Sequence, residues 1–153
     1  AHTGPMPLSA VRRIANWVNL STPLGLTIAR LGRAQVRQDH EGLYWAEGYR
    51  FRFPVAGAFT VGNVIITASH FEELGPAVWA HEVRHTWQWT LCGSSFLPLY
   101  IAAMGWSWAL TGDRAAQNPF ERIAGLGAGG YHDQPLRRPV AKALQRLREV
   151  VRH

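Results

Sequence analysis

The sequence has little of several residue types. Cys92 is the only cysteine among 153 residues, which excludes an intramolecular disulfide and a zinc site built from several cysteines. Charged residues make up only 17% of the chain and apolar residues 47%, a balance that argues against disorder. A chain of this length can bury roughly 70% of its unfolded surface, so we expect one domain, residues 1–153, that needs no metal merely to hold a small core.

Lysine is also scarce, because fifteen arginines and one lysine supply the net charge of +6. The arginines are spread along the chain with modest clusters at Arg12-Arg13, at Arg50 and Arg52, and between Arg137 and Arg152. Such a dispersed positive charge favours solubility and is weak evidence for nucleic-acid binding. We therefore do not expect nucleic acid as a partner. The amino terminus lacks a basic stretch followed by an apolar core, so the expected location is cytoplasmic.

A long segment carries no charge at all. No Asp, Glu, Lys or Arg lies between Arg84 and Asp113, and residues 96–110 are strongly apolar. Pro98 and Gly105 interrupt this run, which favours a buried core helix over a membrane span. Peripheral contact with a membrane stays open as an alternative.

The hydrophobic pattern predicts an α+β fold that is mainly helical. Alternation of Tyr49, Phe51 and Phe53 with arginines predicts a strand, and the β-branched segment 59–67 predicts a second, with a bulge or kink at Gly62-Asn63. These two strands, expected to be antiparallel, precede the central helix. Helical segments are expected at residues 8–20, 22–32, 76–91 and 97–110, at a short segment from 120, and at 139–152.

The most informative segment is His81-Glu82-Val83-Arg84-His85, which falls in the helix expected to begin at Pro76. Histidines at positions i and i+4 lie on one helical face, so both rings can reach a single tetrahedral ion. Glu82 lies at the edge of that face, where a carboxylate can accept a proton from water at the metal. The competing interpretation is a helix that contains two core histidines by chance.

A catalytic zinc site needs a third protein ligand. Glu121 is the preferred candidate, because Asn118-Pro119 predicts the start of a helix that would hold it rigidly. The competitors Asp113, His132 and Asp133 fall in expected loops.

Other polar side chains have weaker predicted roles. Gln88 returns to the face of His81 and can orient a metal ligand by a hydrogen bond, although a surface position explains it equally well. Tyr100 and Tyr131 are candidate hydrogen-bond donors to an oxyanion. The tryptophans are expected in the core rather than at a substrate platform, namely positions 79, 87, 89, 106 and 108.

The chain resembles the zincin metallopeptidases, and more narrowly a bacterial metallopeptidase-like family with a minimal zincin core. The resemblance rests on residues 58–62 (AFTVG) with Ile65, on residues 79–88 (WAHEVRHTWQ), and on residues 118–124 (NPFERIA). It covers less than half of the chain. It implies a short sheet, an active-site helix and a second helix that bears Glu121.

The resemblance also implies a set of roles. His81, His85 and Glu121 would hold zinc and Glu82 would act as the base. The edge strand would pair with a peptide substrate, and Thr60, Gly62 and Tyr131 are tentative substrate-binding residues. Many glutamate-type zincins (gluzincins) carry an aspartate four residues after the ligand glutamate, whereas this chain has Gly125 there.

Two functions from different classes follow. The first is a zinc-dependent metallopeptidase-like hydrolase that acts on a peptide or amide carbonyl of a peptide or protein substrate. The second is a zinc-binding scaffold or interaction module without turnover, which the small size of the chain favours; a basic, membrane-peripheral binding domain ranks third.

Overall fold

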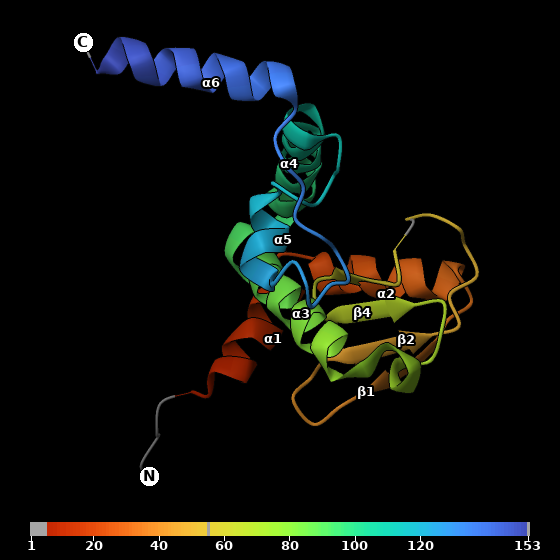
Figure 1. Cartoon of the computed structure of the whole chain (residues 1–153). Coiled ribbons are helices and arrows are strands. Elements are labelled where there is room, and N and C mark those ends of the chain that lie inside the picture. The colour runs from red at the N-terminus through yellow and green to blue at the C-terminus, as the bar shows by residue number, and fades with distance from the viewer. Residues whose placement is uncertain (1–5, 55, 153) are drawn as a thin grey trace. The chain divides into compact units, whose positions relative to one another are not determined.

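The computed structural model describes residues 6–54 and 56–152. It divides the chain into two compact units, Ala1–Leu97 and Pro98–His153 (Figure 1). The fold is α+β and mainly helical, as predicted, with a small sheet that precedes a long helix. The expectation of a single domain stays a prediction.

The first unit contains a four-stranded mixed sheet. Its strands lie in the order β1-β2-β4-β3, with β2 parallel to β4 and the other neighbours antiparallel. The strands are β1 (Gln35–Gln38), β2 (Tyr44–Glu47), β3 (Ala58–Val61) and β4 (Val64–Thr67). The antiparallel pair β3 and β4 is not the expected one, because both strands come from the single segment predicted at 59–67. Strand β1 and the parallel pairing were not predicted.

The segment 59–67 is a hairpin rather than one strand with a kink. Gly62 and Asn63 form a two-residue turn between β3 and β4, and Gly62 has a φ of 63°. Two-residue hairpin turns require such positive φ values, which glycine adopts without strain. The predicted irregularity at Gly62-Asn63 is thus the turn itself.

The strand predicted from the alternation at residues 49–53 is wrong. Tyr49 is buried, but Phe51 and Phe53 are 55% and 81% exposed, and residues 48–53 belong to no strand. The strand lies just before them, as β2, and Gly48 with a φ of 74° follows its last residue. This positive φ ends the extended conformation, so the alternating aromatic and arginine residues that follow Gly48 do not form a strand.

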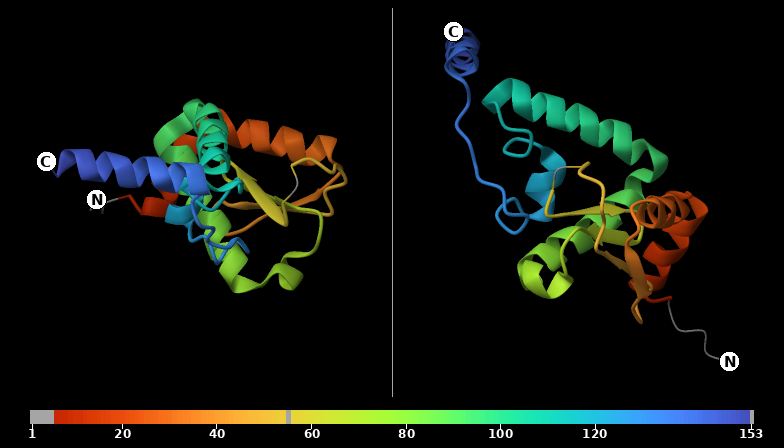
Figure 2. Two further views of the ribbon diagram at one scale, coloured as in Figure 1. Left: turned by 45° about the horizontal axis from the view of Figure 1, so that its top comes forward. Right: turned by 90° about the vertical axis from the view of Figure 1, so that its right-hand side faces the viewer.

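Two helices begin the chain, α1 (Leu8–Val18) and α2 (Ser21–Leu31). The turn between them depends on Asn19, whose side-chain oxygen accepts from the backbone N–H of Ser21 at 3.0 Å. Leu26 and Ala29 of α2 form the main apolar cluster with Val64 and Ile66 of β4. This cluster fixes α2 on one face of the sheet (Figure 2).

All four residues of β4 are buried, so the opposite face of the sheet is covered as well. The covering element is α3 (Phe71–Cys92), which packs against β3 and β4. Gly75 interrupts it with φ 78° and ψ 168°, and Pro76 starts the regular helix. Proline is favoured at a helix start because it lacks an N–H, so this predicted boundary is confirmed. Gly93 follows the last residue of α3, also as predicted.

The second unit carries α5 (Pro119–Ala124), α6 (Arg138–Val151) and nearly all of α4 (Phe96–Thr111), which follows the short 3-10 helix η1 (Gly93–Ser95). The Asn118 side chain accepts from the N–H of Phe120 at 3.0 Å, which confirms the predicted cap of α5. The N–H of Arg137, just before α6, donates to the carbonyl of Leu110 in α4 at 2.8 Å.

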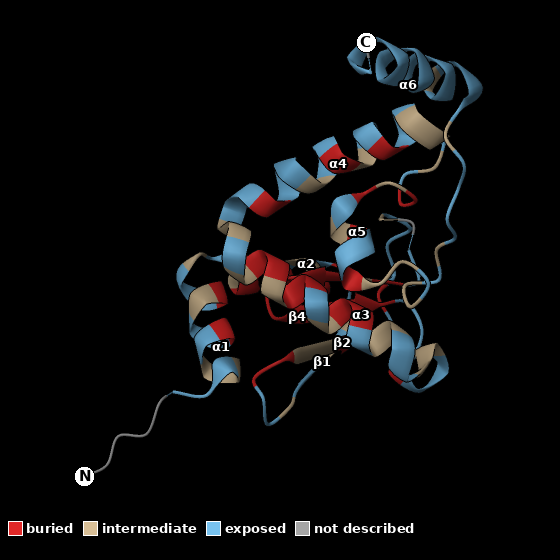
Figure 3. Ribbon diagram, turned by 60° about the vertical axis from the view of Figure 1, so that its left-hand side comes forward, coloured by how far each residue is buried: buried red, intermediate tan, exposed pale blue. Residues whose placement is uncertain are grey.

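The prediction that α4 is buried nearly all round is wrong. Trp106 and Trp108 are 61% and 54% exposed, and Leu99 and Ile101 are exposed too, whereas Ser107 and Ala103 are buried (Figure 3). The helix carries no charged residue, so periodicity could not reveal which side faces water. No helix in the described part of the chain is both long and apolar enough to cross a membrane.

Candidate metal centre

The central part of α3 directs polar side chains inward. His81, Glu82, His85 and Gln88 are all buried, the most exposed being Gln88 at 8%. The spacing of His81, His85 and Gln88 places them on one side of a helix, with Glu82 at its edge. Buried ionisable groups on one helical face are costly unless they are bonded or bind an ion, so their contacts identify this face as the candidate site.

The two histidine rings converge. Nε2 of His81 and Nε2 of His85 are 3.0 Å apart, with the rings nearly perpendicular at 83°. Zinc binds imidazole nitrogen at about 2.0–2.1 Å, so two nitrogens at this separation can bind the same ion. The geometry therefore fits a shared metal.

Gln88 orients the second histidine. Its Oε1 lies 2.7 Å from Nδ1 of His85. Because an amide oxygen only accepts, Nδ1 of His85 carries the proton and Nε2 keeps its lone pair for a metal. The hydrogen bond predicted for Gln88 is therefore present, and its role toward a metal stays a prediction.

Glu82 is held by the sheet. The hydroxyl of Thr60 in β3 donates to Oε2 of Glu82 at 2.7 Å, and the Thr60 carbonyl accepts from the indole N–H of Trp89 at 2.9 Å. The strand thus sets the position of the candidate base, with Trp89 holding the strand against α3. The sequence did not reveal this role of Thr60; its predicted contact with substrate stays a prediction.

A second polar network joins α3 to α1 and to the hairpin turn. The amide nitrogen of Asn16 in α1 donates to Oδ1 of Asn63 at 2.8 Å and to the carbonyl of Thr86 at 3.0 Å. Asn16, Asn63 and Thr86 are all fully buried. Sequence reasoning missed these asparagines, because nothing in the pattern marks a polar side chain as buried.

Gly62, the other tentative substrate residue of the first unit, is packed against α2. A Cβ at this position would lie 2.5 Å from the Ser21 carbonyl carbon and 2.5 Å from the Thr22 nitrogen. Close approach together with the positive φ accounts for glycine here. Its role toward substrate stays a prediction.

The second unit holds Glu121 in the first turn of α5, where only 2% of the residue is exposed. The hydroxyl of Tyr100 in α4 donates to Oε1 of Glu121. Tyr100, a candidate donor to an oxyanion by sequence, therefore has the carboxylate of Glu121 as its partner.

The competing ligands in this unit have other surroundings. Oδ1 of Asp113 accepts from the N–H groups of Ala115 and Ala116, both at 2.8 Å, and Asp133 pairs with Arg122 at 3.2 Å. His132 is exposed. Tyr131, the third tentative substrate residue, is half-buried and donates its backbone N–H to the Leu126 carbonyl at 3.1 Å.

His81, His85 and Glu121 thus form a buried group of donor types that could hold a metal ion. No protein-family model, curated protein or solved structure matches the chain.

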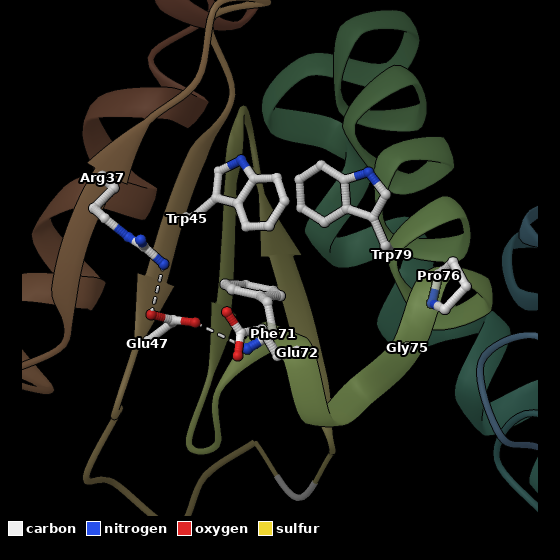
Figure 4. A pocket seen from close by; sticks show the side chains of 8 residues that line it. All are labelled: Arg37, Trp45, Glu47, Phe71, Glu72, Gly75, Pro76 and Trp79. Atoms are coloured by element: carbon white, nitrogen blue, oxygen red, sulfur yellow. Dashed lines mark hydrogen bonds and ion pairs between the residues drawn. The ribbon is translucent and has the colours of Figure 1, made fainter.

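A separate pocket of about 490 Å³ opens near the start of α3 (Figure 4). Trp79 stacks on Trp45 of β2 there, with ring centroids 3.7 Å apart, and Phe71 packs edge-on against both. Two residues along a helix turn the side chain by about 200°, so Trp79 points away from the side that carries His81. The pocket is distinct from the histidine pair.

Glu47 also lines this pocket. Its carboxylate accepts from the backbone N–H of Phe71 at 2.9 Å and pairs with Arg37 at 2.9 Å. The hydrogen bond from Phe71, followed by the positive charge of Arg37, lowers the pKa of Glu47 below its ordinary value. Glu47 thereby fixes the start of α3 to β2.

Proposed function

We propose that the chain is a zinc-dependent hydrolase of peptide or amide bonds, with zinc held by His81, His85 and Glu121. The observation that carries the proposal is the pair of buried imidazoles whose Nε2 atoms face each other 3.0 Å apart, one of them oriented by Gln88. Surface histidines have no need of such an arrangement. Two histidines and one glutamate are a ligand set typical of zinc sites that act in catalysis.

Glu121 is proposed as the third ligand on three grounds. It is a carboxylate, it is almost fully buried, and the start of a capped helix holds it. The Tyr100 hydroxyl on Oε1 would orient that carboxylate, as partners of metal ligands commonly do. Asp113 and Asp133 are weaker candidates, because each carboxylate already serves a turn or an ion pair.

Glu82 is proposed as the general base. When bound, zinc would polarise a carbonyl and make a water molecule easier to deprotonate. The Thr60 hydroxyl fixes Oε2 of Glu82, so the carboxylate would take up the proton at a defined position. The same hydrogen bond stabilises the ionised form, which is the form a base requires.

An extended peptide is the proposed substrate class. β3 is the last strand of the sheet, and its outer edge pairs with no other strand in the described residues. An open edge can accept a peptide as an additional strand through backbone hydrogen bonds. Since Thr60 of β3 also contacts Glu82, a peptide on this edge would lie beside the proposed base.

The first test is the metal content of the purified full-length chain, measured by mass spectrometry after preparation without chelators. We expect about one zinc per chain, as in a site with three protein ligands. His81→Ala and His85→Ala should each lower this content strongly. A metal-free wild-type protein that also fails to bind added zinc would overturn the proposal.

The base is tested with Glu82→Gln and a matched control, Glu73→Gln, which makes the same change at an exposed position of α3. On a mixture of fluorogenic peptides, Glu82→Gln should keep the zinc and lose at least about a hundredfold in kcat, the usual size of a general-base contribution. Glu73→Gln should match the wild type. Zinc binding without hydrolysis of any peptide would instead support the scaffold function.

The third ligand is tested with Glu121→Gln against Asp133→Asn. The first variant should lower zinc content at equal helicity, and the second should leave it unchanged. The reverse result would move the third ligand to Asp133 and remove Glu121 from the site.

A further inference from the structure

Helix α6 separates its residues into two faces. At about 100° per residue, one side carries only apolar side chains and the other carries the charges. The apolar face consists of Val140, Ala143, Leu144, Leu147, Val150 and Val151. Four cations, Arg138, Lys142, Arg146 and Arg148, stand against a single carboxylate, Glu149.

The apolar face of α6 is not buried against any other part of the chain that the structure describes. No residue of the helix is buried, and Leu147 and Val151 are 60% and 84% exposed (Figure 3). Over fourteen residues this face is roughly 20 Å long, which is large for an apolar stripe left in water. Arg146 and Arg148 fall at its two borders by the same periodicity.

The end of α4 lies beside the start of α6. The guanidinium of Arg137 lies 4.8 Å from the ring centroid of Trp108, in addition to the backbone bond to Leu110. Trp108 itself is 54% exposed. Tryptophan with its apolar body and polar N–H is the side chain favoured at the boundary between lipid and water.

We propose that α6, together with Trp108 near the end of α4, binds the surface of a membrane that contains anionic lipids. The apolar face would enter the interface between headgroups and acyl chains, and the arginines at its borders would extend to the lipid phosphates. A basic surface for nucleic acid would need the charges but not the apolar face. Anionic lipid satisfies both, and charge complementarity selects it over a neutral membrane.

The experiment measures co-flotation of the full chain with vesicles of phosphatidylcholine alone or with about 30 mol% phosphatidylglycerol. We expect binding to the anionic vesicles only, and weaker binding when NaCl rises from about 0.1 M to about 0.5 M. Neutralising two cations in Arg146→Gln/Arg148→Gln should weaken binding by about fivefold for each charge.

Two matched variants separate the faces. Leu147→Glu places a carboxylate at the centre of the apolar face, and Ala141→Glu places the same charge on the polar face; both positions are exposed, so the fold should tolerate them. Leu147→Glu should bind at least about tenfold more weakly than Ala141→Glu, since it also loses a leucine that would be buried in the membrane. Circular dichroism checks that both remain helical.

Several results would overturn the proposal. These are equal binding to neutral and anionic vesicles, equal losses in Leu147→Glu and Ala141→Glu, or binding to random duplex DNA but to no vesicle. The Glu82→Gln variant should bind vesicles like the wild type, so this outcome is independent of the proposed metal chemistry.

Discussion

The two units of the chain depart from the usual burial pattern in different ways. The first unit buries polar groups with their partners, such as Asn16 with Asn63 and Thr60 with Glu82, around a sheet whose strand β4 is wholly enclosed. The second unit leaves apolar side chains in water along α4 and α6. Polar residues inside and apolar residues outside reverse the usual preference, and the reversal is informative in both places.

Each departure indicates a different kind of role. A buried polar network costs free energy unless every group is bonded, so it is kept where it fixes a geometry, here that of α3 and its histidines. An exposed apolar face lowers the solubility of a protein. Large faces of this kind are typical of surfaces that bind a partner. The first unit thus holds the two candidate histidines in a bonded framework, and the second unit carries an exposed apolar face and the candidate ligand Glu121.

The largest contrast is expected in hydrogen exchange. Amides of β4 and of the centre of α3 should exchange only through global unfolding, whereas amides of α6 should exchange through local opening, with protection lower by about 3–6 kcal/mol. The physical reason is that no side chain of α6 is buried. Mass spectrometry of deuterium uptake checks this; equal protection in α6 and β4 would remove the distinction between the units.

A pair of glycine variants tests the same contrast. A Cβ on Gly25 of α2 would press on the Val61 carbonyl and lie 2.9 Å from Cβ of Val64, whereas a Cβ on Gly105 of α4 meets nothing within 4 Å. Gly25→Ala should cost about 3 kcal/mol of unfolding free energy through overpacking. Gly105→Ala should add about 0.5–1 kcal/mol through helix propensity. Urea denaturation measures both, and a similar effect in the two helices would contradict the comparison.

Polar networks of the two units should differ in strength as well. Asn16→Ala leaves Oδ1 of Asn63 and the Thr86 carbonyl buried without this donor, at an expected cost of about 2–4 kcal/mol. Ser107→Ala removes the bonds to the Asp113 carbonyl and from the Gln117 N–H, which close a local turn, at about 1–2 kcal/mol. Thermal unfolding compares them. A larger loss in Ser107→Ala would place the stability of the chain in the second unit.

Sequence patterns predicted local features of the fold well. The irregularity at Gly62-Asn63, the start of α3 at Pro76, its end before Gly93 and the cap of α5 all depend on residues whose backbone preferences act within a few positions. The strand at residues 49–53 failed because Gly48 ends the extended segment before the alternation begins. Strand β1 was missed because its four residues, QVRQ, carry almost no apolar signal.

In the candidate site, too, the sequence predicts local relations and misses contacts between distant residues. The relation of His81, His85 and Gln88 follows from helical spacing, so the sequence contains it. The bond from Thr60 to Glu82 joins residues that are 22 positions apart, and that from Asn16 to Asn63 joins residues 47 apart. Such contacts depend on how the sheet and helices pack, which periodicity does not describe. The exposure of α4 was missed because a helix without charges shows no polar face.

The smallest effect concerns two carboxylates, one in each unit. The pKa of Glu47 is lowered by the Phe71 N–H and by Arg37, so its stabilisation is present above the ordinary glutamate value of 4.5 and is lost as the pH falls through the lower folded value. Glu47→Gln should therefore cost about 1–2 kcal/mol at pH 7 and clearly less near about pH 3. Asp133 pairs with Arg122 at the surface, so Asp133→Asn should change stability by less than about 0.5 kcal/mol. Urea unfolding at both pH values measures the difference, and a Glu47→Gln effect that does not shrink at the lower pH would show that the charge of Glu47 is not what fixes α3 to β2.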